Sequence, residues 1–184
     1  MHSAHVALAR TALDQLALDE VRWIPAGEAW QKVRGLAAAE HRVAMVALAI
    51  AGEPRYVLDR CEVDRQGPSF TLDTVRELQT AQPDARCFLI IGQDQYTRLH
   101  TWHGFEELLS RVVLAVANRP GTTREPDQAV RRAERDSVAL PMMDISSTAI
   151  RQAAVQGEAF HPLVPDAVAR YIEEHRLYRG FPRS

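Results

Sequence analysis

Two uninterrupted apolar runs constrain the fold of this chain more than any other feature. They span residues 87–91 (CFLII) and 112–117 (VVLAVA). Strands with apolar residues on both faces are typical of parallel sheets, which are covered on both sides. A helical pattern separates the two runs, and parallel strands need such crossovers. We therefore expect an α/β fold, a Rossmann-like three-layer domain built on a parallel sheet.

The remaining elements follow the same alternation of helix and strand. Further strands are predicted at 21–24, 55–59 and 138–142, and helices at about 6–20, 38–51, 71–80, 105–109, 128–136 and 166–175. Another helix is predicted to begin near Ser147. The first helix has no strand before it. A parallel sheet that opens on a helix is incomplete, so we expect its first strand to be missing from these 184 residues.

Length and composition narrow the class of protein. A chain of 184 residues suits one domain, which we place over 1–184. The net charge of −2 argues against a nucleic-acid binder, since such proteins usually carry a basic surplus. No apolar stretch is long enough for a membrane span, and the chain opens on no signal peptide. The two cysteines have neither metal-ligand nor redox spacing. We expect a soluble cytoplasmic protein; a homo-oligomer is compatible with the sequence.

Two histidines stand at the start of the first helix. His2 and His5 are three residues apart and therefore share one face. A helix N-terminus attracts phosphate through its free N–H groups and its dipole, and imidazoles there can donate to phosphate oxygens. Taken alone, a pair at this spacing also fits an accident at a chain end.

A second phosphate-type pattern lies at residues 145–151 (ISSTAIR). Ser146, Ser147 and Thr148 open a helix after a strand, and Arg151 follows one turn later. Hydroxyl groups and exposed N–H groups form a phosphate nest, to which arginine adds a permanent charge. A simple N-cap with a solvated arginine is the alternative.

Gly92 and Asp94 end the most apolar strand, and Trp102 follows shortly after. In α/β folds ligands sit beyond the carboxyl ends of the strands, where a carboxylate can hold ribose hydroxyls and a tryptophan can stack on a flat ring. A turn aspartate with a core tryptophan explains the same residues. Lys32, Arg42 and Arg119 read singly as surface charges.

Read in order, these pieces resemble the bacterial nicotinate-nucleotide adenylyltransferases of the nucleotidylyltransferase superfamily, almost from end to end. The matching segments are His2-Ser3-Ala4-His5, Ile24-Pro25, Trp30-Gln31-Lys32, His41-Arg42 with Met45, Gly67-Pro68-Ser69-Phe70-Thr71 with Thr74, Gly92-Gln93-Asp94, Trp102, Arg119-Pro120-Gly121, 145–151, and Tyr171-Ile172 with Leu177-Tyr178. The order of the motifs, more than any single one, carries the resemblance.

Three departures from the family pattern stand out. Ala4 replaces the usual glycine of the HxGH signature, and Trp30-Gln31 replaces the commoner Pro-Pro-His before Lys32. The family also has a first strand and a Gly-Gly-(Thr/Ser)-Phe-Asp-Pro loop before the first histidine. We therefore expect the natural start to lie upstream of Met1.

The resemblance implies adenylyl transfer from ATP to nicotinic acid mononucleotide, giving deamido-NAD and pyrophosphate in NAD biosynthesis, with Mg²⁺ on the triphosphate. By analogy the catalytic residues are His2 and His5. The ATP-binding residues are Ser146, Ser147, Thr148, Arg151, Arg119 and Lys32. The residues that bind the mononucleotide are Thr71, Gly92, Asp94, Trp102 and Arg42.

Three alternatives stay open on sequence. A sister enzyme that acts on nicotinamide mononucleotide or phosphopantetheine would share the ATP half. A truncated, weakly active nucleotide-binding form would keep the motifs with little turnover. A zinc site on His2, His5 and His41 lacks a fourth ligand, so we expect no protein-bound metal.

Overall fold

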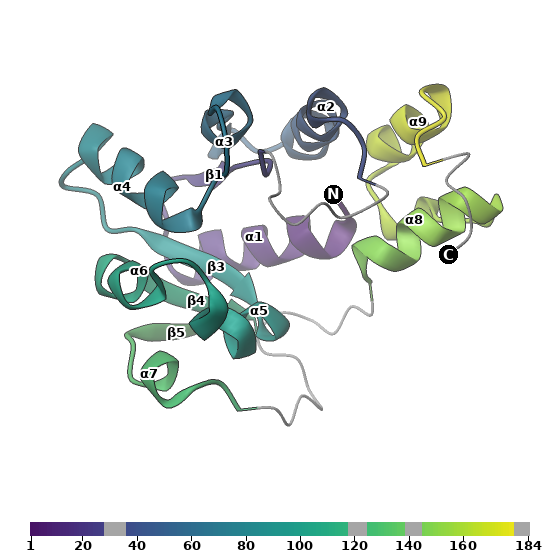
Figure 1. Cartoon of the computed structure of the whole chain (residues 1–184). Coiled ribbons are helices and arrows are strands. Elements are labelled where there is room, and N and C mark those ends of the chain that lie inside the picture. Colours follow the sequence, from purple (N-terminus) through teal and green to yellow (C-terminus); the bar gives the residue numbers. More distant parts are fainter. Residues whose placement is uncertain (28–35, 118–124, 139–144, 179–184) are drawn as a thin grey trace. The chain divides into compact units, whose positions relative to one another are not determined.

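The computed structural model describes residues 1–27, 36–117, 125–138 and 145–178 of the chain (Figure 1). These residues divide into two compact units, and each is described by itself. The first unit comprises Met1–Ala7, Asp19–Pro68 and Met143–Ser184; the second comprises Leu8–Leu18 and Ser69–Met142. Helix α1 (Ser3–Gln15) contributes residues to both. One domain over 1–184 stays a prediction.

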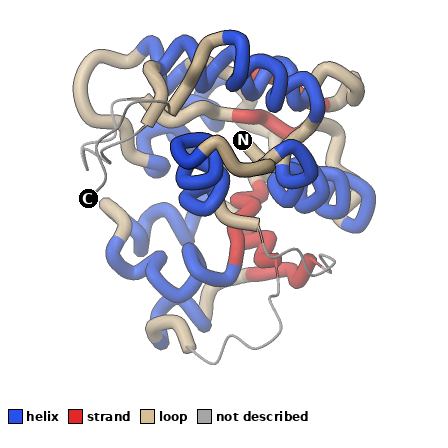
Figure 2. The backbone as a smooth tube through the Cα atoms, turned by 90° about the vertical axis from the view of Figure 1, so that its right-hand side faces the viewer, coloured by secondary structure: helices blue, strands red, loops and turns tan. Residues whose placement is uncertain are grey.

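A three-stranded parallel sheet forms the centre of the second unit (Figure 2). Its order is β3 (Phe88–Gly92), β4 (Val113–Ala117), β5 (Arg135–Val138), with Ile90 paired to Ala115 and Ala115 to Asp136. Every residue of β4 is buried. The uniformly apolar sequence of this strand therefore reflects its central position, with cover on both faces.

Helices supply that cover within the second unit. They are α4 (Thr71–Ala81), α5 (Gln93–Arg98), the 3₁₀ helix η1 (Leu99–Thr101), α6 (Phe105–Arg111) and α7 (Gln128–Arg131). Leu99, Leu108 and Leu114 are fully buried in one apolar cluster with parts of these helices. Ala12 of α1 packs in a smaller cluster with Ala115 and Val138, so this part of α1 lies against the sheet.

The first unit holds two short parallel strands, β1 (Val21–Trp23) and β2 (Tyr56–Leu58). Its helices are α2 (Ala39–Ile50), α3 (Cys61–Asp64), α8 (Ser147–Gln156), the 3₁₀ helix η2 (His161–Leu163) and α9 (Asp166–Glu174). One face of each long helix meets in an apolar core that includes Met45, Ile150, Val168 and Ile172. This core fixes the three helices that surround the cavity described below.

Helix α9 ends in a Schellman turn built without glycine. The N–H of Arg176 donates to the Glu173 carbonyl at 3.0 Å, and the N–H of Leu177 donates to the Ile172 carbonyl at 2.9 Å. These two bonds define the motif, whose turning residue is usually glycine because its φ is positive. Arg176 occupies that position with φ 50°, and Tyr178 follows with φ 68°. The buried side chain of Leu177 holds the turn against the core.

The predicted α/β class and the parallel strand pairings are confirmed. The described strands form two sheets rather than the one that was predicted, because the sequence indicates which segments are strands but not which strands pair. The strand predicted at 138–142 is wrong in its start: β5 spans Arg135–Val138, and 139–142 lie outside the described residues. The charged helix predicted to 136 ends at Arg131, because Arg135 and Asp136 pair with β4 and tertiary pairing overrides their helical preference.

Sequence analysis missed the short helices α3 and α5. Elements of four to six residues carry too few apolar positions to show a period. Across the described ranges, no helix has the length and apolar character needed to cross a bilayer.

Candidate active site

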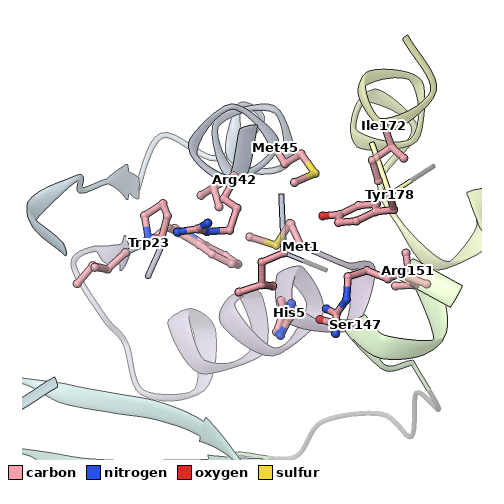
Figure 3. Close-up of a pocket in the computed structure, with 14 residues that line it drawn as sticks. Met1, His5, Trp23, Arg42, Met45, Ser147, Arg151, Ile172 and Tyr178 are labelled. Carbon is pink, nitrogen blue, oxygen red and sulfur yellow. The ribbon is translucent and has the colours of Figure 1, made fainter. Parts of the chain in front are cut away.

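A cavity of about 310 Å³ opens within the first unit (Figure 3). It is lined by the start of α1, the end of β1 and the segment after it, helix α2, the first turns of α8, and the C-terminal segment of α9. The lining residues are Met1, His5, Trp23, Ile24, Pro25, Leu36, Arg42, Met45, Val46, Ser147, Ile150, Arg151, Ile172 and Tyr178. Motifs that are far apart in the sequence therefore line the same cavity, as the resemblance implied.

The two predicted catalytic histidines form a stacked pair at the first turn of α1. Their ring centroids are 3.6 Å apart with an interplanar angle of 17°. His2 is buried, with 6% of its surface exposed, and its Nδ1 has no hydrogen-bond partner among the residues that the structure describes. His5 is more exposed and faces the cavity. The stack lets the partly exposed ring of His5 rest on a fixed, buried neighbour.

Both imidazoles are neutral near pH 7. Burial, followed by repulsion from His5 and from the N-terminal amino group, lowers the pKa of His2 to about 3. Burial, together with the amino group, lowers the pKa of His5 to about 4. A neutral imidazole has one N–H donor and one acceptor. The pair can therefore offer hydrogen bonds to a ligand without carrying charge.

Helix α8 presents its first turn to the same cavity. Ser146 is its N-cap, and the Ser146 Oγ accepts a hydrogen bond from the Ala149 N–H at 3.1 Å. Arg151 donates to the Thr148 Oγ1 at 3.2 Å. Ser147 and Arg151 line the cavity, whereas Ser146 and Thr148 do not. The four predicted phosphate residues thus share one helix start, where two face the cavity and two shape the turn.

Arg42 lines the cavity wall, but most of its donors are already engaged. Its Nη1 donates to the Ala37 carbonyl at 2.7 Å, and its Nη2 donates to the carbonyls of Ala26 and Gly27. Its buried Nε has no hydrogen-bond partner in the described part of the chain. Arg42 therefore fixes the backbone on both sides of residues 28–35, and its positive charge remains at the edge of the cavity.

Four of the residues predicted to bind the mononucleotide lie in the second unit. Thr71 begins α4, Gly92 ends β3, Asp94 stands in the first turn of α5, and Trp102 follows η1. A Cβ at Gly92 would meet no described atom within 4 Å, so the space beside this residue has room for a side chain. Trp102 packs its half-buried ring against the core of the unit.

Two predicted ATP-binding residues, Lys32 and Arg119, lie outside the described residues, as do Trp30 and Gln31. Sequence reasoning gave no role to two aromatic residues of the cavity. Trp23 was assigned only to a strand, and Tyr178 only to a terminal pattern. The signal available for Tyr178 was its position four residues beyond a strongly amphipathic helix, which brings the chain back to the core face.

No acidic side chain is among the described residues that line this cavity, whereas Arg42, Arg151, His5, Ser147 and Tyr178 all are. Guanidinium and hydroxyl groups at a helix start favour an anion, above all a phosphate. In the part of the chain that the structure describes, no group of three histidine, cysteine or carboxylate side chains could hold a metal ion. The geometry therefore suits a ligand that carries phosphate.

Comparison with known proteins agrees with this geometry. The cytidylyltransferase-like family model matches residues 1–153. The "Probable nicotinate-nucleotide adenylyltransferase" of Methylibium petroleiphilum is 52% identical over 96% of this chain and 86% of its own length. The protein of the same name from Albidiferax ferrireducens is 40% identical over 97% of this chain and 92% of its own.

Solved structures show the same fold. Plasmodium falciparum nicotinic acid mononucleotide adenylyltransferase complexed with NaAD superimposes with a TM-score of 0.79 at 15% identity, covering 97% of this chain and 91% of the other. The same enzyme complexed with APC gives 0.77 at 14% identity, with the same two coverages. The Rossmann-like fold is thereby confirmed. A nucleotidyltransferase with an ATP-type substrate points to a divalent metal ion. The chain belongs to the nicotinate-nucleotide adenylyltransferases, within the cytidylyltransferase-like family.

Proposed function

We propose that this chain transfers the adenylyl group of ATP to nicotinic acid mononucleotide, forming deamido-NAD and pyrophosphate. One observation carries the proposal: His5, Ser147 and Arg151 line one cavity that no described carboxylate lines. That set of donors suits a triphosphate. The named relatives supply the acceptor, since their names specify nicotinate nucleotide.

In the proposed reaction, a 5′-phosphate oxygen of nicotinic acid mononucleotide attacks the α-phosphorus of ATP. The bond from that phosphorus to the oxygen bridging to the β-phosphorus breaks, and pyrophosphate leaves with the bonding electron pair. Such transfers depend on positioning and on stabilising charge, more than on covalent chemistry by the protein. The described residues at the cavity supply both through hydrogen-bond donors and arginine charge.

We assign the imidazoles to the donor nucleotide. His5 faces the cavity and would donate its N–H to an ATP phosphate oxygen as negative charge develops. The stacked, buried ring of His2 would keep His5 in place. Since both pKa values lie well below 7, the pair would act as neutral donors, which leaves the countercharge to arginine.

The start of α8 would receive the leaving pyrophosphate. Ser147 and Arg151 reach the cavity directly, and Ser146 and Thr148 hold the helix start and the arginine in place. Lys32 and Arg119 remain predicted phosphate ligands. Mg²⁺ would be held by the phosphate oxygens, because the described cavity wall offers no carboxylate, and it would add positive charge to the triphosphate.

The acceptor would lie at the strand ends of the second unit. Thr71, Gly92, Asp94 and Trp102 are the proposed contacts, with Trp102 near the pyridine ring and Asp94 near the sugar. The stacked pair Phe70 and His103, with centroids 4.3 Å apart, adjoins Thr71 and Trp102 in sequence and adds a flat aromatic surface. Arg42 we retain as a contact through its charge, and as the residue that fixes the neighbouring backbone.

Pyrophosphate release tests this function. The chain is supplied with ATP, Mg²⁺ and one of three acceptors: nicotinic acid mononucleotide, nicotinamide mononucleotide or phosphopantetheine. We expect the highest kcat/KM with nicotinic acid mononucleotide. Preference for another acceptor would establish a sister activity, and no release with any acceptor would reject adenylyl transfer.

The variant His5→Ala tests the site itself. Loss of one donor to developing charge typically lowers kcat by about 10²–10³. The matched control is His100→Ala, an exposed histidine of η1 in the second unit. We expect turnover to fall only in the first variant, with circular dichroism unchanged in both. Near-normal turnover of His5→Ala would reject the role given to His5.

A further inference from the structure

We propose that Tyr178 contacts the nucleotide, its hydroxyl donating a hydrogen bond to a phosphate bound beside Arg151. This inference rests on the proposed function and adds a residue to its ATP half. Motif reasoning assigned no role to Tyr178, although this residue lines the cavity together with Arg42 and Arg151.

The position of the ring carries the proposal. Figure 3 shows the Tyr178 hydroxyl pointing into the cavity from the side where Ile172 and Arg151 lie, opposite the wall that carries Trp23. The side chain is half-buried, so it packs on one side and is open on the other. Nothing described fills the space in front of the hydroxyl.

The backbone explains why the ring turns inward. The Schellman turn at Arg176 reverses the chain after α9, and Leu177 anchors the reversal in the core. Tyr178 then adopts φ 68°, the second left-handed non-glycine residue within three positions. Such conformations persist where the surroundings determine them, and they gather at ligand sites.

The Tyr178 hydroxyl is a protonated donor in the field of two arginines. Burial raises the pKa of Tyr178, and the nearby charges of Arg151 and Arg42 offset only part of that rise. The hydroxyl therefore keeps its proton at pH 7. A neutral O–H in the field of two arginines favours an anionic acceptor, and the phosphates of ATP supply one.

Tyr171 provides a matched control in the same segment. Its hydroxyl lies 3.0 Å from the His41 Nδ1, and Tyr171 does not line the cavity. Tyr178→Phe and Tyr171→Phe each remove one hydroxyl and keep the ring. Only the first removes a donor from the cavity, so a general effect of hydroxyl loss would appear in both.

Calorimetry measures binding of inorganic pyrophosphate and of Mg-ATP to the full chain and to both variants. We expect Tyr178→Phe to bind both ligands roughly tenfold more weakly, the effect of losing one hydrogen bond to a charged group. We expect Tyr171→Phe to bind them as the parent does. The KM for nicotinic acid mononucleotide and the melting temperature should stay unchanged in Tyr178→Phe.

Affinity of Tyr178→Phe within twofold of the parent for both ligands would overturn the assignment, as would an equal loss in Tyr171→Phe. Failure of the Tyr178 contact can be distinguished from failure of the proposed function. If the parent forms no deamido-NAD but Tyr178→Phe still loses affinity for pyrophosphate, the acceptor is wrong and the Tyr178 contact stands. A parent chain that binds neither ligand would refute the contact.

Discussion

The buried His2 should make the protein less stable at mildly acid pH than at pH 7. Its folded pKa of about 3 lies below the ordinary value of 6.5, because the ring is buried and lies near His5 and the N-terminal amino group. The folded state thus binds a proton less readily than the unfolded state. The contribution to stability is full above pH 6.5, and it is lost as the pH falls from 6.5 towards 3.

The size of the effect follows from the two pKa values. A difference of one in pKa corresponds to about 1.4 kcal/mol. At pH 5, an unfolded histidine is almost fully protonated while His2 remains neutral in the folded state. The free energy of unfolding should therefore be about 2 kcal/mol lower at pH 5 than at pH 7 through this group alone.

Urea unfolding at pH 7 and pH 5 measures this difference. We expect His2→Asn to lose about 2 kcal/mol less than the parent between the two pH values, whatever its stability at pH 7. His100→Asn, which replaces an exposed histidine, should lose as much as the parent. Equal losses in the parent and in His2→Asn would show that His2 is not buried in its neutral form.

Three further substitutions test the local structure. Ser146→Ala removes the cap bond to the Ala149 N–H and should lower the unfolding free energy by about 1 kcal/mol in urea titrations; an unchanged value would contradict the cap. Arg176→Gly removes the steric strain of the left-handed φ of 50°. We expect the variant's unfolding free energy to equal the parent's or to exceed it by up to about 1 kcal/mol. A clear decrease would contradict the Schellman turn. Leu114→Ala opens a cavity in the fully buried strand β4 and should cost about 2–5 kcal/mol, whereas an effect below about 1 kcal/mol would place β4 at the surface.

The apolar runs predicted β3 and β4 almost to the residue, because a strand buried on both faces leaves a continuous signal. The start of β5 was not predictable in this way. Its residues Arg135 and Asp136 are polar, and they form a strand because β4 offers them a pairing edge. A fully buried strand can thus be predicted from its own residues, whereas a partly exposed strand depends on the neighbour with which it pairs.

The same division holds for the candidate site. His5, Ser147 and Arg151 were predicted from motifs, and all three line the cavity. Motif reasoning also assigned Arg42 to the ligand, but it did not indicate that the guanidinium is engaged by three backbone carbonyls. It also did not identify Tyr178, because the position of this residue depends on a turn without glycine, which the sequence pattern does not indicate.

Helix α8 places its proposed ligand contacts and its core contacts next to one another on one face. Ser147 and Arg151 face the cavity, while Ile150 touches both the cavity and the core and Ala154 lies in the core. Few substitutions in this helix can alter the cavity without also altering the core, so we expect its sequence to tolerate little change. Thr71 and Trp102 belong to the other unit and carry no such constraint from this core. If Thr71 and Trp102 contact the acceptor as proposed, acceptor preference can diverge at those positions while the nucleotide half stays the same.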